Sequence, residues 1–174
     1  MKKIAVTGPE STGKSTLCEQ LADHYGVTWV PEYAREYLLQ HGMEYTYDDL
    51  LTIAKGQLAL EEKYMTAAAQ SLIFMDTDLY VIKIWCEFVF GKCHQWILDR
   101  IAEKKYDLYL LCNIDLPWVK DTLREYPDLT PRRQLYHMYK DAMINQATPW
   151  IEISGTNEQR LKNAVKVIDG MIAQ

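Results

Sequence analysis

The chain has 174 residues, of which 48% are hydrophobic and 25% are charged, and these values are typical of a single globular domain over residues 1–174. The formal net charge of −5 at pH 7 disfavours a nucleic-acid partner, because nucleic-acid-binding domains usually carry a basic surface. The sequence shows neither a leader pattern nor an apolar run of about 18 residues, so we expect a cytoplasmic protein with no membrane partner.

Short apolar runs alternate with longer amphipathic patterns along the chain, which predicts alternating strands and helices. Strands are predicted over residues 3–8, 27–30, 71–78, 107–113 and 149–154. Helices are predicted over residues 14–26, 33–42, 47–70, 79–89, 93–104, 132–145 and 156–172, and a polar stretch covers residues 114–133. This order predicts a three-layer α/β fold, with a five-stranded parallel sheet covered by helices on both faces.

The turn between the first strand and the first helix reads GPESTGKS over residues 8–15 and fits the phosphate-binding pattern GxxxxGK[ST]. Gly8 lets the chain turn sharply off the strand, and Gly13 lets backbone N–H groups approach phosphate oxygens closely. Lys14 is expected to reach the β- and γ-phosphates of ATP, and the Ser15 hydroxyl is expected to bind Mg²⁺. Further nucleotide contacts are expected from Glu10, Ser11, Thr12 and Thr16, although Thr16 is alternatively an ordinary first-turn residue.

Acidic residues end two of the predicted strands, at the edge of the sheet where the phosphate loop lies. Asp76 follows the apolar run LIFM, an arrangement typical of a Mg²⁺ site, with a helix cap or a surface acid as the alternative. Asp78 either contacts the substrate or caps the following helix. Glu32 is predicted to be the catalytic base or a ligand of the substrate hydroxyl, with Arg35 beside it at the substrate. The alternative for Glu32 and Arg35 is a plain surface ion pair.

The polar stretch after the fourth strand carries Arg124, Arg132 and Arg133. In small kinases an arginine-bearing lid closes here over the triphosphate and supplies positive charge to the transition state. Arg124 and Arg132 are the predicted catalytic arginines, and a solvated basic patch is the alternative. Asp115 and Trp118 are predicted to line the acceptor site, unless Trp118 simply packs under the loop.

Two short motifs argue against other classes of phosphate-loop protein. A GTPase needs the guanine-reading motif Asn-Lys-x-Asp near the fourth strand, and this chain has CNID, with Ile114 in place of the lysine. AAA+ and helicase motors usually carry paired acids after the third strand, and MDTD lacks the adjacent glutamate. A small-molecule kinase is the remaining class that suits a chain of this length.

Five segments stand out in order along the chain: TGPESTGKSTL, VPEYARE, DTD, DLPWVKDTLRE and PWIEISG. Together they resemble the ribosylnicotinamide kinase domain of the NadR family, in its stand-alone, AAA-type form. The resemblance covers residues 3–170, and the first two segments are its most specific parts. It implies a P-loop NTPase fold of the kinase type and the transfer of the γ-phosphoryl group of Mg·ATP to nicotinamide riboside. The acceptor atom would be the 5′-hydroxyl oxygen, and the product would be nicotinamide mononucleotide, in NAD salvage.

The resemblance also implies roles for individual residues. The family's phosphate loop falls on Gly8–Thr16, and its third-strand acid falls on Asp76. Its substrate-side residues and the region of its lid arginines fall on Glu32, Arg35, Arg124 and Arg132. The regulatory and dinucleotide-forming activities of longer NadR proteins are not expected from these residues. The alternatives are a kinase for another nucleoside or nucleotide, and a non-catalytic module that senses ATP.

Overall fold

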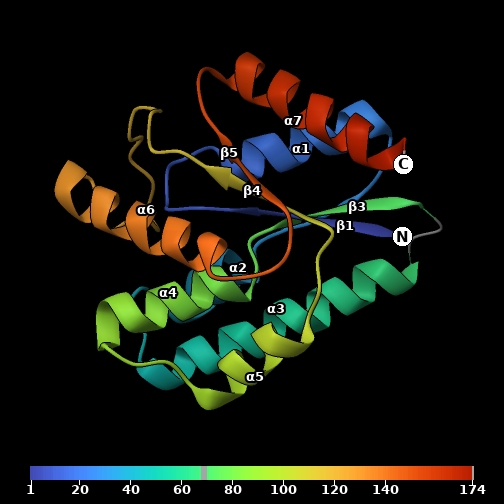
Figure 1. Cartoon of the computed structure of the whole chain (residues 1–174). Helices are drawn as coiled ribbons and strands as arrows, with labels where there is room; N and C mark the ends of the chain where they lie inside the picture. The colour runs from blue at the N-terminus through green and yellow to red at the C-terminus, as the bar shows by residue number, and fades with distance from the viewer. Residues whose placement is uncertain (68–69, 174) are drawn as a thin grey trace.

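A sheet of five parallel strands forms the centre of the protein (Figure 1). The computed structural model of the chain describes residues 1–67 and 70–173. The strands are β1 (Lys2–Thr7), β2 (Trp29–Val30), β3 (Leu72–Asp76), β4 (Leu108–Cys112) and β5 (Trp150–Ile153). They lie in the order β2-β3-β1-β4-β5. The predicted five-stranded parallel sheet is confirmed.

Helices cover both faces of this sheet. They are α1 (Lys14–Tyr25), α2 (Tyr33–His41), α3 (Tyr47–Ala67), α4 (Leu79–Phe90), α5 (Gln95–Glu103), α6 (Leu129–Ile144) and α7 (Asn157–Ile172). Helices α1 and α7 pack on one face, and α4 and α6 pack on the other (Figure 1). Beyond that second face, α2, α3 and α5 form a further apolar cluster with α4. The three-layer arrangement is the predicted one.

The central strands are buried on both faces, as parallel strands between two helical layers must be. Strands β3 and β4 are buried along their whole length. In β1, Ile4 and Val6 pack with α1 and α7, whereas Ala5 between them packs with α4 and α6. Continuous apolar runs, rather than alternating ones, are therefore the sequence signature of these strands.

The predicted helix ends differ from the observed ones by a few residues, which is usual for frayed helix termini. The helix predicted over residues 47–70 corresponds to α3, which is described as far as Ala67, and residues 68–69 lie outside the described part of the chain. Among the described residues, no helix combines the length and the apolar character needed to cross a membrane.

Helix α6 begins at Leu129, earlier than predicted, so the predicted lid region 114–133 includes its first turn. Pro131 falls within that turn, where its missing N–H is not needed, and the helix can therefore begin before it. Arg132 consequently belongs to the helix and not to a loop. We call residues 113–128, between β4 and α6, the lid segment.

The carboxyl ends of three neighbouring strands bring the predicted site residues together. Val6 of β1 lies opposite Asp76 of β3, and Val30 of β2 lies opposite Met75. The phosphate loop follows β1, Glu32 follows β2, and Asp76 ends β3. All three therefore reach the same edge of the sheet, where open α/β folds bind their ligands.

Candidate active site

The phosphate loop, residues 8–16, is held in shape by its own polar groups. The Thr12 hydroxyl donates to the carbonyl oxygen of Pro9 at 2.7 Å, and the Lys14 ammonium donates to the same oxygen at 2.9 Å. Gly13 is the N-cap of α1 in a left-handed conformation and carries no side chain that could cap the helix. The N–H groups of the first turn of α1 are therefore available to an anion, as a phosphate site requires.

Glycine is needed at the first position of this loop for two reasons. Gly8 has a φ of 135°, and a Cβ atom added to it would lie 2.8 Å from the carbonyl oxygen of Cys112. The positive φ would strain the backbone of most other residues, and an added side chain would collide with the end of β4. The loop can approach the sheet this closely only without a side chain.

The phosphate loop forms one wall of a cavity of about 210 Å³. Every residue of the loop lines the cavity, and the other walls come from α2, α4, α6 and the lid segment. Residues on these walls include Glu32, Arg35, Trp85, Arg124, Glu125 and Tyr126. The cavity therefore combines a phosphate-binding end with a second end that carries acidic, basic and aromatic side chains.

Glu32 lines the cavity from the N-terminus of α2. It is the N-cap residue, yet within the described chain its carboxylate makes no capping hydrogen bond to the helix and lines the cavity instead. Burial raises the pKa of Glu32, Lys14 opposes this shift, and the negative charge of Asp76 adds to it. A carboxylate with a raised pKa beside a phosphate site is suited to accept a proton from a hydroxyl.

Asp76 ends β3 and is only 2% exposed. Burial raises its pKa, while the charge of Lys14 and the Ser15 hydroxyl oppose the shift. Its Oδ1 atom has no hydrogen-bond partner among the described residues. A buried carboxylate oxygen without a partner, beside a serine hydroxyl, fits the oxygen ligands that Mg²⁺ prefers.

Helix α3 positions the backbone next to Glu32. The Oε1 atom of Gln57, a residue 1% exposed, accepts the backbone N–H of Tyr33 at 2.8 Å. A Cβ atom on Gly56 would lie only 2.0 Å from the Tyr33 ring, so α2 and α3 can approach only because residue 56 is glycine. Sequence reasoning missed this pair, although a glycine inside a helical pattern is a known signal of close packing.

Replacing Gly56 with alanine is expected to destabilise the protein by about 1–3 kcal/mol, because the added methyl group would displace the Tyr33 ring. Thermal unfolding of the variant measures this change. The matched control is Gly170→Ala in α7, where, apart from its chain neighbours and the nearby backbone of its own helix, no atom of the described chain lies within 4 Å of the added Cβ. That control is expected to be at least as stable as the wild type, because alanine favours helices. A Gly56→Ala protein of unchanged stability would contradict the contact.

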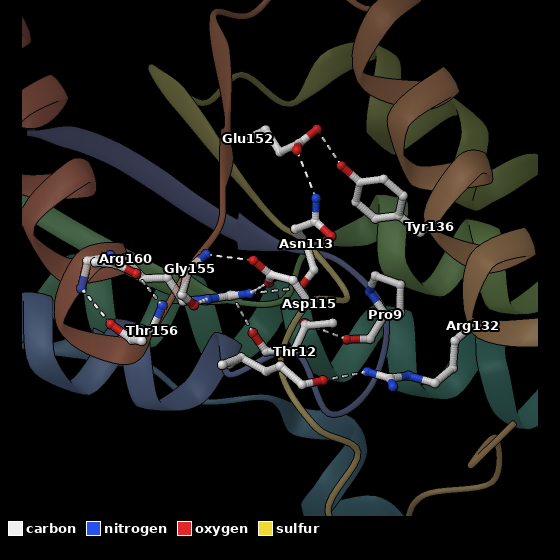
Figure 2. Close-up of polar contacts among 12 residues, drawn as sticks. Pro9, Thr12, Asn113, Asp115, Arg132, Tyr136, Glu152, Gly155, Thr156 and Arg160 are labelled. Atoms are coloured by element: carbon white, nitrogen blue, oxygen red, sulfur yellow. Dashed lines mark hydrogen bonds and ion pairs between the residues drawn. The ribbon is translucent and has the colours of Figure 1, made fainter. Parts of the chain in front are cut away.

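A fully buried arginine links the phosphate loop to the ends of β4 and β5 (Figure 2). The guanidinium of Arg160, 1% exposed, donates to the carbonyl oxygens of Thr12 and Gly155 at 2.8 Å and of Asn113 at 2.9 Å. It also pairs with Asp115, which accepts the N–H of Gly155 at 2.6 Å. The structure therefore places Asp115 in this cluster instead of the predicted acceptor site, because a buried guanidinium needs a counter-charge.

Arg160→Met is expected to destabilise the protein by about 2–4 kcal/mol, since it leaves three carbonyl oxygens without their donor and Asp115 without its partner. Denaturant unfolding measures the loss. Lys162→Met, an exposed change on the same helix, is the control and is expected to change stability little. Equal stabilities of the two variants would show that the Arg160 cluster contributes nothing to folding.

The two predicted catalytic arginines occupy different places. Arg124 lines the cavity and donates to the carbonyl oxygen of Val119 within the lid segment. Arg132 is 5% exposed in the first turn of α6, where its Nη2 donates to the carbonyl oxygen of Leu116 at 3.4 Å (Figure 2). Burial lowers the pKa of Arg132. Unlike Arg124, Arg132 is not among the described residues that line the cavity.

Two other residues predicted at the substrate have structural partners and are not among the described residues lining the cavity. Asp78 is 1% exposed and caps α4 by accepting the N–H of Val81 at 3.3 Å. Burial raises its pKa to about 6. The Trp118 indole N–H donates to Glu10 of the phosphate loop at 3.2 Å. The capping alternative therefore describes the position of Asp78, whereas Trp118 is bonded to the phosphate loop through Glu10.

The second end of the cavity contains residues that sequence reasoning missed. Trp85 and Phe88 reach it from α4, and Glu125 and Tyr126 reach it from the lid segment. The Trp85 indole N–H donates to the Tyr45 hydroxyl at 2.8 Å, and that hydroxyl donates to Glu125 at 3.0 Å. Aromatic residues are abundant in this chain, so their number alone could not identify the ones in the cavity.

The family described as AAA domain (AAA_28) matches residues 3–160 of the chain. The chain belongs to this family. Two curated relatives of this AAA-domain protein carry the name "Trifunctional NAD biosynthesis/regulator protein NadR", from Salmonella typhimurium and from Escherichia coli. Each is 26% identical to it over 179 residues, which cover the whole chain and 43% of the relative. The resemblance to NadR is confirmed, and the chain spans less than half the length of these relatives.

Solved structures similar to this AAA-domain protein support the same fold. A NadR protein in complex with NR has a TM-score of 0.78 at 22% identity, and the match covers 96% of this chain and 50% of that one. Thymidylate kinase from Ehrlichia chaffeensis has a TM-score of 0.69 at 15% identity, covering 96% and 98%. Deoxyadenosine kinase from M. mycoides has a TM-score of 0.65 at 13% identity, covering 97% and 100%. The protein therefore has the P-loop kinase fold.

Proposed function

We propose that this protein is an ATP-dependent kinase that transfers the γ-phosphoryl group to the 5′-hydroxyl of nicotinamide riboside, giving nicotinamide mononucleotide. One observation carries the proposal: the carboxylate of Glu32, which does not cap α2, and the phosphate loop line the same cavity. A phosphate cradle alone binds nucleotides, whereas a base beside it can activate an acceptor. NadR, which this chain resembles, has been solved with NR and with NAD and AMP-PNP.

The donor nucleotide would be held by the phosphate loop. Its backbone N–H groups and the uncapped N-terminus of α1 would bind the phosphate oxygens, and Lys14 would exchange the Pro9 carbonyl for the β- and γ-phosphates. Arg124, on the lid wall of the cavity, would neutralise charge that develops on the transferred group. These contacts act mainly by electrostatics, as phosphoryl transfer requires.

Ser15 and the unpartnered Oδ1 of Asp76 are the residues that would hold Mg²⁺, directly or through water. When bound, the ion would neutralise phosphate charge next to Lys14. The Thr77 hydroxyl, next in the chain, is also buried and lies close enough to Glu32 to lower the pKa of that carboxyl group. A buried carboxylate oxygen without a partner, as at Asp76, is uncommon and suits a site that fills when ligands bind.

The acceptor would lie between Glu32 and the aromatic end of the cavity. Glu32 would accept the proton of the 5′-hydroxyl while the hydroxyl oxygen attacks the γ-phosphorus and ADP leaves. Arg35, which also lines the cavity, would bind a ribose hydroxyl. The side chains of Trp85 and Tyr126 with the carboxylate of Glu125 would suit a cationic ring, and nicotinamide riboside carries one.

A coupled assay of ADP release with a panel of ribosides tests the proposal. The panel contains nicotinamide riboside, adenosine, deoxyadenosine, thymidine and thymidine monophosphate, with a no-acceptor control. We expect nicotinamide riboside to raise ADP release and to yield its 5′-monophosphate by mass spectrometry. Stimulation by another acceptor alone would make the protein a kinase for that compound. ATP binding without stimulation by any acceptor would favour a sensing module and would overturn the kinase assignment.

A further inference from the structure

Glu10 belongs to the phosphate loop, yet its carboxylate is bonded to the lid segment. Its Oε1 atom accepts the backbone N–H of Tyr126 at 2.6 Å and the Trp118 indole N–H at 3.2 Å. Its Oε2 atom accepts the backbone N–H of Glu125 at 2.9 Å. A carboxylate inside a phosphate-binding loop repels the phosphates bound there. Glu10 is therefore expected to serve a purpose other than phosphate binding.

Two of the three donors that Glu10 binds, the backbone N–H groups of Glu125 and Tyr126, belong to the wall of the cavity. Residues 123–126 all line the cavity, and they include Arg124. Two of the three hydrogen bonds are made to backbone N–H groups of this short run, so they orient the chain itself. Glu10 therefore joins the loop that would hold the donor phosphates to the wall that would hold the acceptor.

The start of the lid segment, residues 113–116, is held separately by the buried Arg160 and Arg132, so the Glu10 contacts act on residues 118–126. Over residues 118–124 the other contacts are weaker or more exposed. Ser11 Oγ accepts the N–H of Val119 at 2.9 Å, a single neutral hydrogen bond. Arg35 pairs with Asp121 at 3.2 Å, but its side chain is 53% exposed, and exposed ion pairs contribute little. Hydrogen bonds to an ionised carboxylate are stronger than neutral ones. Glu10 accepts three such bonds from residues 118–126, and the Tyr45 hydroxyl adds one to Glu125, so Glu10 makes the largest share of the attachment of this part of the lid.

We propose that Glu10 is a positioning residue that couples the two substrate sites. It holds the lid segment against the phosphate loop, so that the acceptor wall forms where the γ-phosphoryl group is presented. The coupling part of this inference rests on the proposed kinase function, whereas the attachment of the lid does not. Glu10 acts through the backbone of Glu125 and Tyr126 and needs no contact with either substrate.

Limited trypsin digestion tests the attachment in the absence of any substrate. The lid segment offers cleavage after Lys120 and Arg124. We expect Glu10→Ala to speed cleavage at these bonds about tenfold, since the lost charge-assisted bonds correspond to roughly that change in the open population. Glu10→Gln is expected to lie between, because its amide oxygen still accepts one N–H while its NH₂ group faces another.

Glu62→Ala, an exposed change in α3, is the control and should digest at the wild-type rate. Thermal unfolding of each variant distinguishes a local release of the lid from a general loss of stability. Faster lid cleavage at an unchanged unfolding temperature supports the proposal. Equal cleavage rates in the wild type and Glu10→Ala, or a parallel loss of global stability, overturn it.

Steady-state kinetics test the coupling. We expect Glu10→Ala to raise the KM of the acceptor about tenfold, to change the KM of ATP less than about threefold, and to release more ADP per phosphorylated acceptor. Unchanged acceptor KM, or an equal rise in both KM values, overturns the coupling. If the wild-type protein phosphorylates no acceptor, the proposed function fails, and the digestion rates still decide whether Glu10 holds the lid.

Discussion

Glu32→Gln is expected to lower kcat for phosphoryl transfer by about 10²–10⁴-fold, which is the usual contribution of a general base. Glutamine keeps the size of the side chain and removes its ability to take a proton. Because Lys14 and the loop N–H groups are untouched, ATP affinity is expected to stay within about threefold of the wild type. Steady-state kinetics and calorimetric titration with a non-hydrolysable ATP analogue measure the two quantities.

The control for this prediction lies one turn further along α2. Glu36 is exposed and accepts a hydrogen bond from Gln40 at 3.2 Å, away from the lining of the cavity. Glu36→Gln makes the same chemical change and is expected to leave kcat and both KM values unaltered. Full activity of Glu32→Gln, or an equal loss in both variants, would show that Glu32 is not the base.

Asp76→Asn is expected to lower kcat at least about 10²-fold, comparable to the loss of one preorganised electrostatic contact in an active site. The asparagine amide is a poorer Mg²⁺ ligand than a carboxylate and carries no charge. Stability is expected to be unchanged or higher, since the substitution removes a buried carboxylate whose Oδ1 has no partner in the described chain. Activity is measured over a range of Mg²⁺ concentrations, and stability by thermal unfolding without the ion.

Loss of activity together with loss of folding would indicate a structural role for Asp76 instead. Asp78→Asn provides the comparison. Asp78 lies two residues after Asp76, is as deeply buried, and caps α4. Burial raises the pKa of Asp78 to about 6 and raises that of Asp76 too, so the two carboxyl groups differ in their partners and not in the direction of this shift. Asp78→Asn is expected to retain the Mg²⁺ dependence of the wild type, because asparagine can still cap a helix.

The fold and the phosphate loop could be predicted from the sequence because both leave local patterns. Buried parallel strands appear as continuous apolar runs such as LIFMD and LYLLC, and the loop requires glycines and a lysine at fixed spacing. The sequence also predicted that Glu32 and Asp76 lie at the same edge of the sheet, since the carboxyl ends of neighbouring parallel strands share one edge. Element ends, such as the start of α6 at Leu129, were less predictable because proline tolerates more than one position in a first turn.

The partners of the side chains around the loop were decided by the tertiary structure alone. Arg160 bonds to Thr12 across 148 positions of sequence, and Glu10 bonds to the lid segment across more than 100. Whether Asp115 faces an acceptor or a buried guanidinium depends on the packing of α7, which no local pattern contains. The sequence by itself thus determined the layered fold and the phosphate cradle, through periodicity and spacing. The distances and directions that give the other polar residues their partners arise only when distant segments pack together.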